Sequence, residues 1–202
     1  MKGFGSLFAA MEHHSRRERV VFAASAAVAL LTLLVDQATK LWVVGALHES
    51  RTIIPAVLEF TRVRNTGAAF GMLSGQTWLL LLVALAAFLA ILFFFYDLCE
   101  NYPERYFSLL LVLSGILGNS IDRLWRGNVV DFIHVHYKDV WHYAVFNVAD
   151  IAICVGVGVF VLSSLIRPDR KKAAGNSAGK PKWFGVIKAK KQPDAPEKDE
   201  DR

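Results

Sequence analysis

The sequence predicts an α-helical integral membrane protein with four membrane-spanning helices. Of its 202 residues, 54% are hydrophobic, and the mean hydropathy of +0.35 is high for a soluble domain. The apolar residues gather in four long segments, and most charged residues lie between or beyond them. The length suits one domain, which we place at residues 20–166.

The first predicted span is 20–44, an apolar run of about 25 residues that is long enough to cross about 30 Å of hydrocarbon. Its start resembles a signal peptide, with Arg16, Arg17 and Arg19 before an apolar region, but the run continues past any cleavage site. We therefore expect a retained helix. Residues 1–19 would form a cytoplasmic extension.

Three further segments complete the predicted bundle, at residues 77–96, 106–123 and 145–166, and the second of them ends with the polar residues Asn119, Asp122 and Arg123. Pro103 breaks the chain before this second segment. Two substantial loops remain. The first contains stretches with strand character, residues 52–55 and 58–63, and the second covers residues 125–143.

The basic residues predict the orientation. With four spans both termini lie on one side, which carries Lys2, Arg16, Arg17, Arg19, Arg105 and a basic tail over residues 167–202 that we expect to be disordered. The opposite side carries fewer basic residues, namely Arg51, Arg62, Arg64, Arg123, Arg126 and Lys138. The termini are therefore predicted to be cytoplasmic, with both long loops at the outer face.

Two aspartates occupy unusual settings at that face. Asp131 stands inside the apolar run Val129–Ile133, and Asp150 stands at the mouth of the last span. Apolar surroundings make a carboxylate costly to ionise, and two such acids in one site can divide the work of general acid and base in peptide hydrolysis. The alternative is structural: Asp150 would be a first-turn acid of its helix and Asp131 a loop acid.

Other polar residues near the predicted spans allow two interpretations. Asp36 and Lys40 share a helix face and can neutralise each other, which favours a structural pair over a substrate contact. Asn119, Asp122 and Arg123 either reach a loop or substrate, or form a charged cap at the interface, in which Asp122 would pair with its neighbour Arg123. Gly115 and Gly118 would allow close helix approach.

Several functions are disfavoured by what the sequence lacks. No nucleic-acid motif is present, and the basic tail suits anionic lipid headgroups better. His134, His136 and His142 fall in the second loop without a recognised metal-binding motif, so no metal or other cofactor is expected. A small proton-coupled transporter with intramembrane carboxylates is the alternative function, although the acids gather near one face and no inverted repeat is visible.

Five motifs in this order resemble bacterial lipoprotein signal peptidase, also called signal peptidase II. They are Asp36-Gln37-x-x-Lys40, the run Arg64-Asn65-Thr66-Gly67-Ala68-Ala69-Phe70-Gly71, Gly118-Asn119-x-x-Asp122-Arg123, Val129-Val130-Asp131-Phe132 and Phe146-Asn147-x-Ala149-Asp150. Each motif alone is weak evidence for this family, but all five in this order within four spans are specific for it. One departure is Ser114-Gly115, where two glycines would be expected.

The resemblance implies an aspartic endopeptidase of the bacterial inner membrane with Asp131 and Asp150 as its catalytic residues. It would act, as a monomer among membrane lipids, on diacylglyceryl-modified prolipoproteins and cleave before the lipidated cysteine. Asp36, Lys40, Asn65, Gly67, Asn119, Asp122, Arg123 and Asn147 would support the substrate site. The resemblance also implies a small extracytoplasmic β-like cradle from the first loop, and a loop or short helix that covers the site.

Overall fold

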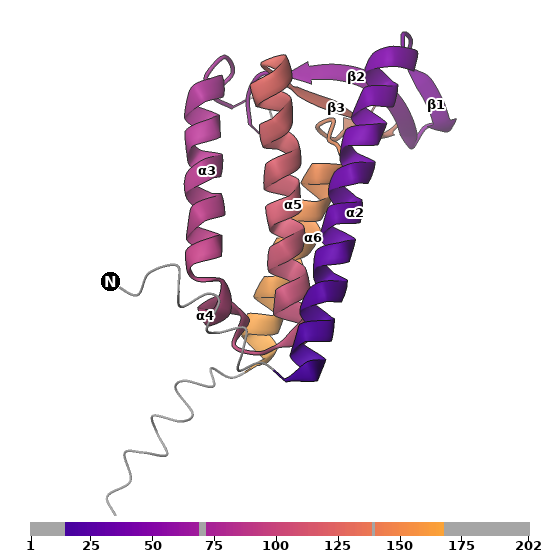
Figure 1. Ribbon diagram of the computed structural model, residues 1–202. Helices are drawn as coiled ribbons and strands as arrows, with labels where there is room; N and C mark the ends of the chain where they lie inside the picture. Colours follow the sequence, from indigo (N-terminus) through magenta and orange to yellow (C-terminus); the bar gives the residue numbers. More distant parts are fainter. Residues whose placement is uncertain (1–14, 69–71, 139, 168–202) are drawn as a thin grey trace, which may run out of the picture. The chain divides into compact units, whose positions relative to one another are not determined.

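The computed structural model describes residues 15–68, 72–138 and 140–167. Up to Leu165 these residues form one unit, in which a helical bundle carries a small sheet at one end (Figure 1). The expected tail, residues 168–202, and most of the expected N-terminal extension lie outside the described residues.

The first helix, α2, spans Arg16–Ala46 and therefore begins inside the segment expected as an extension. Its start is fixed by a capping box, in which the Ser15 hydroxyl accepts the Glu18 N–H and the Glu18 carboxylate accepts the Ser15 N–H. Leu30, Leu31 and Leu34 are exposed along its length. An apolar exterior of this kind matches hydrocarbon rather than water.

Helix α3 spans Thr77–Phe93, and the short helix α4 follows over Phe95–Cys99. The second predicted span therefore ends earlier than Tyr96. Helices α2, α5 and α6 are long and apolar enough to cross a membrane, and α3 has 17 residues, the lower limit for a span. The protein is thus a multi-pass membrane protein with four apolar helices in its described part.

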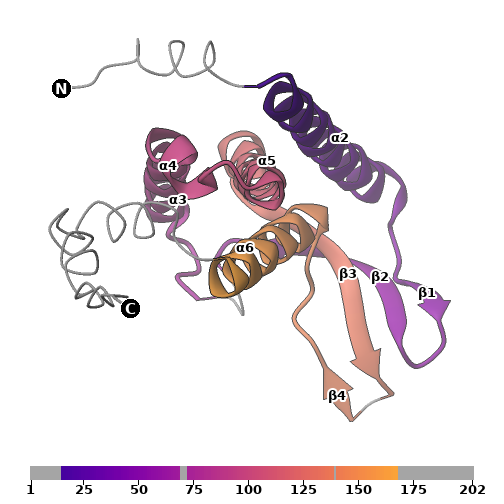
Figure 2. The same cartoon turned by 90° about the horizontal axis from the view of Figure 1, so that it is seen from below.

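Helix α5 spans Pro103–Arg126 and lies between the other long helices (Figures 1 and 2). The predicted span of 106–123 was three residues too short at each end, because Pro103 begins the helix instead of preceding it and Arg126 extends the last turn as the partner of Asp122. The helix ends where Gly127 adopts a left-handed φ of 72° and donates its N–H to the Arg123 carbonyl. The chain then enters a strand within two residues.

The sheet contains strands β1 (Arg51–Ile54), β2 (Leu58–Asn65), β3 (Val129–Tyr137) and β4 (Trp141–His142), all antiparallel and in that order. The strand character of the first loop is confirmed. In the second loop, where a loop or short helix was expected, the described residues form β3 and β4 instead. Val43, Leu47, Val130 and Phe132 form the core that joins α2 to β3.

The last helix, α6, spans Val148–Ile166 and packs closely against α5. Gly156 makes this approach possible: a Cβ there would lie 2.6 Å from the Ser108 carbonyl oxygen. Gly115 similarly faces Ala149 and Ile153. Small residues at a helix crossing let two membrane helices approach closely, so the predicted role of Gly115 in close packing is confirmed.

Two glycines on the same helix provide a test of this packing. Gly156→Ala should destabilise the protein by about 1–3 kcal/mol, because the new methyl group forces α5 and α6 apart. Gly158→Ala is the matched control, since its Cβ would meet nothing within 4 Å. Thermal unfolding of both variants in detergent measures the difference, and equal melting temperatures would contradict it.

Candidate active site

Asp131 is the third residue of β3 and is 2% exposed. Its carboxylate accepts two amide hydrogen bonds, from Asn65 Nδ2 at 2.9 Å and from Asn147 Nδ2 at 2.6 Å. The pKa of Asp131 is raised to about 6, because the upward effects of burial and of the Asp150 charge exceed the downward effects of the two amide hydrogen bonds and the Lys40 charge. The strand thus holds an acid that can gain or lose a proton near neutral pH.

Asp150 lies in the first turn of α6, where it forms a reciprocal cap with Asn147. The Asn147 side-chain oxygen accepts the Asp150 N–H at 3.0 Å, and the Asp150 carboxylate accepts the Asn147 N–H at 3.1 Å. Its other oxygen accepts a hydrogen bond from Asn119 Nδ2 at 2.8 Å. The helix-capping alternative therefore describes part of what Asp150 does, and it leaves the carboxylate at the pocket.

Asn147 connects the two acids. Its side-chain amide donates to Asp131 while its backbone N–H donates to Asp150, so both carboxylates lie within hydrogen-bond distance of one residue. The second hydrogen of that amide is donated to the Asn119 side-chain oxygen at 3.1 Å. Two acids that are 19 positions apart in the sequence thus have Asn147 as a common hydrogen-bond partner.

A buried charged network supports these amides from behind. Lys40 is fully buried, and its Nζ lies 2.9 Å from Asp36, 3.3 Å from Asp122 and 3.0 Å from the Asn119 side-chain oxygen. Asp36 also accepts the Ala149 N–H at 2.9 Å. The predicted Asp36–Lys40 pair is confirmed, and its contacts fix α2 to both α5 and α6.

Asp122 and Arg123 are sequence neighbours that serve different elements. Asp122 pairs with Lys40 and Arg126 and accepts the Val130 N–H, which fixes the start of β3. Arg123 instead donates from Nη2 to the Gly67 carbonyl at 2.8 Å, and so holds the segment that follows β2 near the site. Asp122 is a paired acid, as expected, but its cationic partners are Lys40 and Arg126 rather than Arg123.

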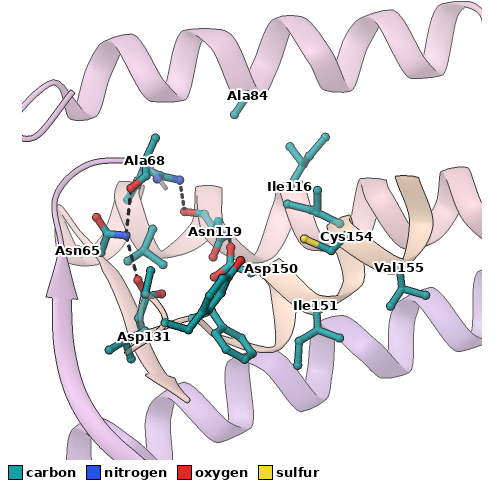
Figure 3. A pocket seen from close by; sticks show the side chains of 17 residues that line it. Asn65, Ala68, Ala84, Ile116, Asn119, Asp131, Asp150, Ile151, Cys154 and Val155 are labelled. Carbon is teal, nitrogen blue, oxygen red and sulfur yellow. Dashed lines mark hydrogen bonds between the residues drawn. The ribbon is translucent and has the colours of Figure 1, made fainter. Parts of the chain in front are cut away.

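Asp131 and Asp150 both line a pocket of about 580 Å³ (Figure 3). Asn65, Asn119 and Arg123 complete its polar part, whereas Ala84 of α3, Ile116 of α5 and Ile153, Cys154 and Val155 of α6 form an apolar part. Tyr143–Phe146, which connects β4 to α6, forms another wall. The pocket can therefore hold an extended chain with an apolar side near two carboxyl groups.

The predicted site residues divide into two groups. Asn65, Asn119, Arg123, Asp131 and Asp150 line the pocket. Behind it, Lys40, Gly67 and Asn147 are partners of these residues, whereas Asp36 and Asp122 are partners of Lys40. The sequence did not single out Arg126, although its position four residues after Asp122 on one helix signals a pair. Ala69–Gly71 of the second motif lie outside the described residues.

The fold and the pocket define a multi-pass membrane protein with two acids gathered at one end of its bundle. Residues 28–166 match the model of the family described as signal peptidase (SPase) II. The lipoprotein signal peptidase of Halalkalibacterium halodurans is 43% identical over 148 residues, which are 71% of this chain and 92% of that protein. That of Bacillus subtilis is 40% identical over 147 residues, 72% and 95% of the two chains.

A solved bacterial membrane enzyme, determined by the in meso method at 2.3 Å resolution, has the same fold. It superposes with a TM-score of 0.66 at 30% identity and covers 79% of this chain and 94% of its own. The chain therefore belongs to the signal peptidase II family, and the resemblance predicted from five motifs is confirmed.

The raised pKa of Asp131 predicts how stability depends on pH. The folded protein holds this proton up to a pH of about 6, whereas an ordinary aspartate releases it near 3.8. Stability should therefore fall as the pH rises through this interval. Asp131→Asn cannot ionise, so at pH 7.5 it should be more stable than the natural protein by up to about 3 kcal/mol.

Thermal unfolding at pH 4 and pH 7.5 measures this effect, and the gain should vanish at the lower pH. Asp97→Asn, at an exposed position, is the control and should show no gain at either pH. If Asp131→Asn were no more stable than the natural protein at pH 7.5, burial would not destabilise the ionised form of this carboxylate.

The buried network makes a second prediction. Lys40→Met leaves Asp36 without its cation and Asp122 with only Arg126, which should cost about 3–5 kcal/mol of stability. Lys138→Met removes an exposed lysine and should cost less than about 1 kcal/mol. Chemical unfolding in detergent compares the two variants. Equal losses would mean that the Lys40 charge does not hold the helices together.

Proposed function

We propose that this signal peptidase uses Asp131 and Asp150 as the catalytic pair of an aspartic endopeptidase. The observation that carries the proposal is their arrangement: both carboxylates line one pocket and both accept hydrogen bonds from Asn147. Two carboxyl groups that share a site resist double ionisation, so one holds a proton while the other is free to accept one.

Hydrolysis then needs one water molecule and no cofactor. The ionised carboxylate takes a proton from the water, whose oxygen attacks the carbonyl carbon of the scissile peptide bond. The protonated carboxyl group gives its proton to the carbonyl oxygen. When the resulting tetrahedral intermediate collapses, the carbon–nitrogen bond breaks and the leaving nitrogen takes the proton that the first carboxylate had taken from the water. The second carboxylate recovers its proton from a hydroxyl group of the intermediate, which leaves the carboxylic acid product.

The amides set the geometry for these proton transfers. Asn65 and Asn147 hold Asp131, and Asn119 and Asn147 hold Asp150, so each carboxylate has a fixed orientation before substrate arrives. These hydrogen-bond donors also stabilise the ionised carboxylates, and so offset the effect of burial, which opposes ionisation. These asparagines are therefore positioning residues, and Arg123 joins them by holding Gly67 at the pocket.

The family membership makes the substrate a prolipoprotein, from which the enzyme removes the signal peptide. We propose that this substrate carries diacylglyceryl on its cysteine and is cut just before that residue. The apolar part of the pocket, with Ile116, Ile153 and Val155, suits an apolar signal segment that enters from the bilayer. The scissile bond would be extended across the two acids, since a helical peptide bond is shielded.

The same proposal includes the placement of the chain. Residues 20–166 are the peptidase domain in the inner membrane, and the segments 1–19 and 167–202 lie in the cytoplasm because the basic residues favour that side. The sheet end of the bundle, which holds the acids, then faces outward. We propose that the enzyme acts as a monomer, since a single chain supplies both acids and the asparagines that hold them.

Cleavage of a lipidated prolipoprotein by the purified enzyme tests the pair. Asp131→Asn and Asp150→Asn should each lower kcat by at least about 1,000-fold, because a carboxamide can neither accept nor donate the required proton. Asp97→Asn at an exposed position should keep normal turnover. Each variant must show a folded helical spectrum, so that lost activity is separated from lost structure.

Normal turnover in either site variant would disprove the catalytic pair. The proton-coupled transporter alternative makes a different prediction, namely proton-dependent transport that requires Asp36 or Asp150 and an absence of cleavage. Reconstituted vesicles can test for that transport in parallel.

A further inference from the structure

Three of the six histidines lie together on the β3–β4 pair, which extends from the bundle (Figure 2). His134 and His136 share a face of β3, and His142 on β4 is the register partner of His136. The three rings are stacked: their centroids lie 5.2, 5.3 and 5.7 Å apart, and their planes meet at 30°, 18° and 13°. The proposed catalysis uses none of these residues, which we call the histidine stack.

One contact within the histidine stack depends on protonation. His142 Nδ1 and His134 Nε2 lie 3.4 Å apart, which is a hydrogen bond only when one nitrogen carries a hydrogen and the other presents a lone pair. A charged imidazole carries a hydrogen on both nitrogens. The contact therefore tolerates one charged ring of the two. A second proton replaces the hydrogen bond by two opposed N–H groups and two like charges at short range.

The neighbouring strands provide one countercharge for the stack. Glu59 on β2 is the register partner of His134, so its carboxylate lies on the same side of the sheet as the rings. Asp131 is three positions from His134 on β3 and therefore lies on the other face. Among the described strands, Glu59 is thus the one carboxylate on the side of the stack.

The other groups around the stack are neutral or cationic. Strand β4 consists of Trp141–His142 and adds no acid, and α2 meets β3 through the apolar residues Val43 and Leu47. Lys138 follows β3, with its carbonyl oxygen 3.2 Å from His136 Nδ1 and its ammonium 5.6 Å from the neighbouring Tyr137 ring. Lys138 adds a further positive charge to this end of the sheet, so a second charged imidazole meets repulsion.

From this geometry we infer that the histidine stack is a pH-operated latch on one wall of the pocket. The wall is Tyr143–Phe146, which begins directly after His142. Tyr143 N–H donates to the Val135 carbonyl at 2.9 Å, and Phe146 N–H donates to the Ile133 carbonyl at 3.0 Å. When the rings are neutral, the stack holds His142 and the Tyr143 end of the wall against β3.

Acid opens the latch. Histidine is the side chain that ordinarily changes charge between about pH 5 and pH 8. The opened state accepts more protons than the closed state, so lowering the pH favours opening. The Tyr143 end then leaves β3, while Phe146 stays bonded to Ile133. The inference rests on the proposed function, because this wall regulates the enzyme only if the pocket binds the substrate.

Hydrogen exchange of the full-length protein in detergent tests the latch when it is resolved by residue. Protection factors at about pH 8 and about pH 5.5 are compared, because they remove the intrinsic pH dependence of exchange. The Tyr143 amide should lose at least about tenfold of its protection on acidification, whereas the Phe146 amide should keep its protection within about twofold.

Two substitutions at His142 separate charge from structure. His142→Gln keeps a neutral side chain that can hydrogen-bond to His134 and cannot gain a charge, so Tyr143 should stay protected at both pH values. His142→Lys is charged at both values and should leave Tyr143 unprotected even at the higher pH. The control is His48→Gln, at an exposed position outside the stack, which should behave as the natural protein does.

Equal loss of Tyr143 protection in the natural protein and in His142→Gln would overturn the latch, because a group outside the stack would then cause the opening. Unchanged Tyr143 protection in the natural protein would overturn it too. Asp131, Asp139 and Asp150 are present in every variant, so their titration cannot produce a difference between variants.

A cleavage assay separates the latch from the proposed function. As the pH falls, the KM of the natural enzyme for a lipidated prolipoprotein should rise at least about threefold relative to that of His142→Gln, while their kcat values stay equal. Equal KM values beside a clear Tyr143 transition would overturn the control of the site by the latch. A Tyr143 transition in a natural protein that cleaves nothing would contradict the proposed function and still support the latch.

Discussion

The arrangement depends on one cation that is excluded from solvent. Lys40 has no exposed surface, so its charge is tolerable only because Asp36, Asp122 and the Asn119 side-chain oxygen surround it. These partners belong to α2 and α5, and Asp36 extends the network to the first turn of α6. Because a buried charge without partners is so costly, the three helices have a single favourable register at the level of the site. The amides that hold the two acids are fixed by that register.

The fold was largely predictable, because membrane spans leave a strong signal. Long apolar runs gave the helices, and the motifs gave the polar residues between them. The errors fall where polar residues are buried by neighbours. The end of α5 was placed three residues too early, because Arg126 was not recognised as the partner of Asp122. Strand β3 was missed because its apolar residues, Val130 and Phe132, form a core with Val43 and Leu47, which are distant in the sequence.

The site shows a similar division. The sequence identifies the two acids by their apolar neighbours, but it cannot show that Asn147 joins them, because that requires the crossing of β3 with the start of α6. It also suggested that Asp122 pairs with Arg123. Adjacent residues on a helix point about 100° apart, so they do not face each other. The rule that residues three or four positions apart meet would have identified Arg126 instead.

The structural and catalytic readings of Asp150 were posed as alternatives, but they require each other. A catalytic carboxylate must be held in one orientation, and the first turn of a helix does this with backbone N–H groups and a favourable dipole. The reciprocal cap with Asn147 uses one carboxylate oxygen and leaves the other for Asn119 at the pocket. Asp131 has no helix to hold it, so two side-chain amides do the same work from the strand. Because Asn147 serves both acids, a displacement of the α6 start would move both carboxylates at once, which explains why α5 and α6 must pack so closely.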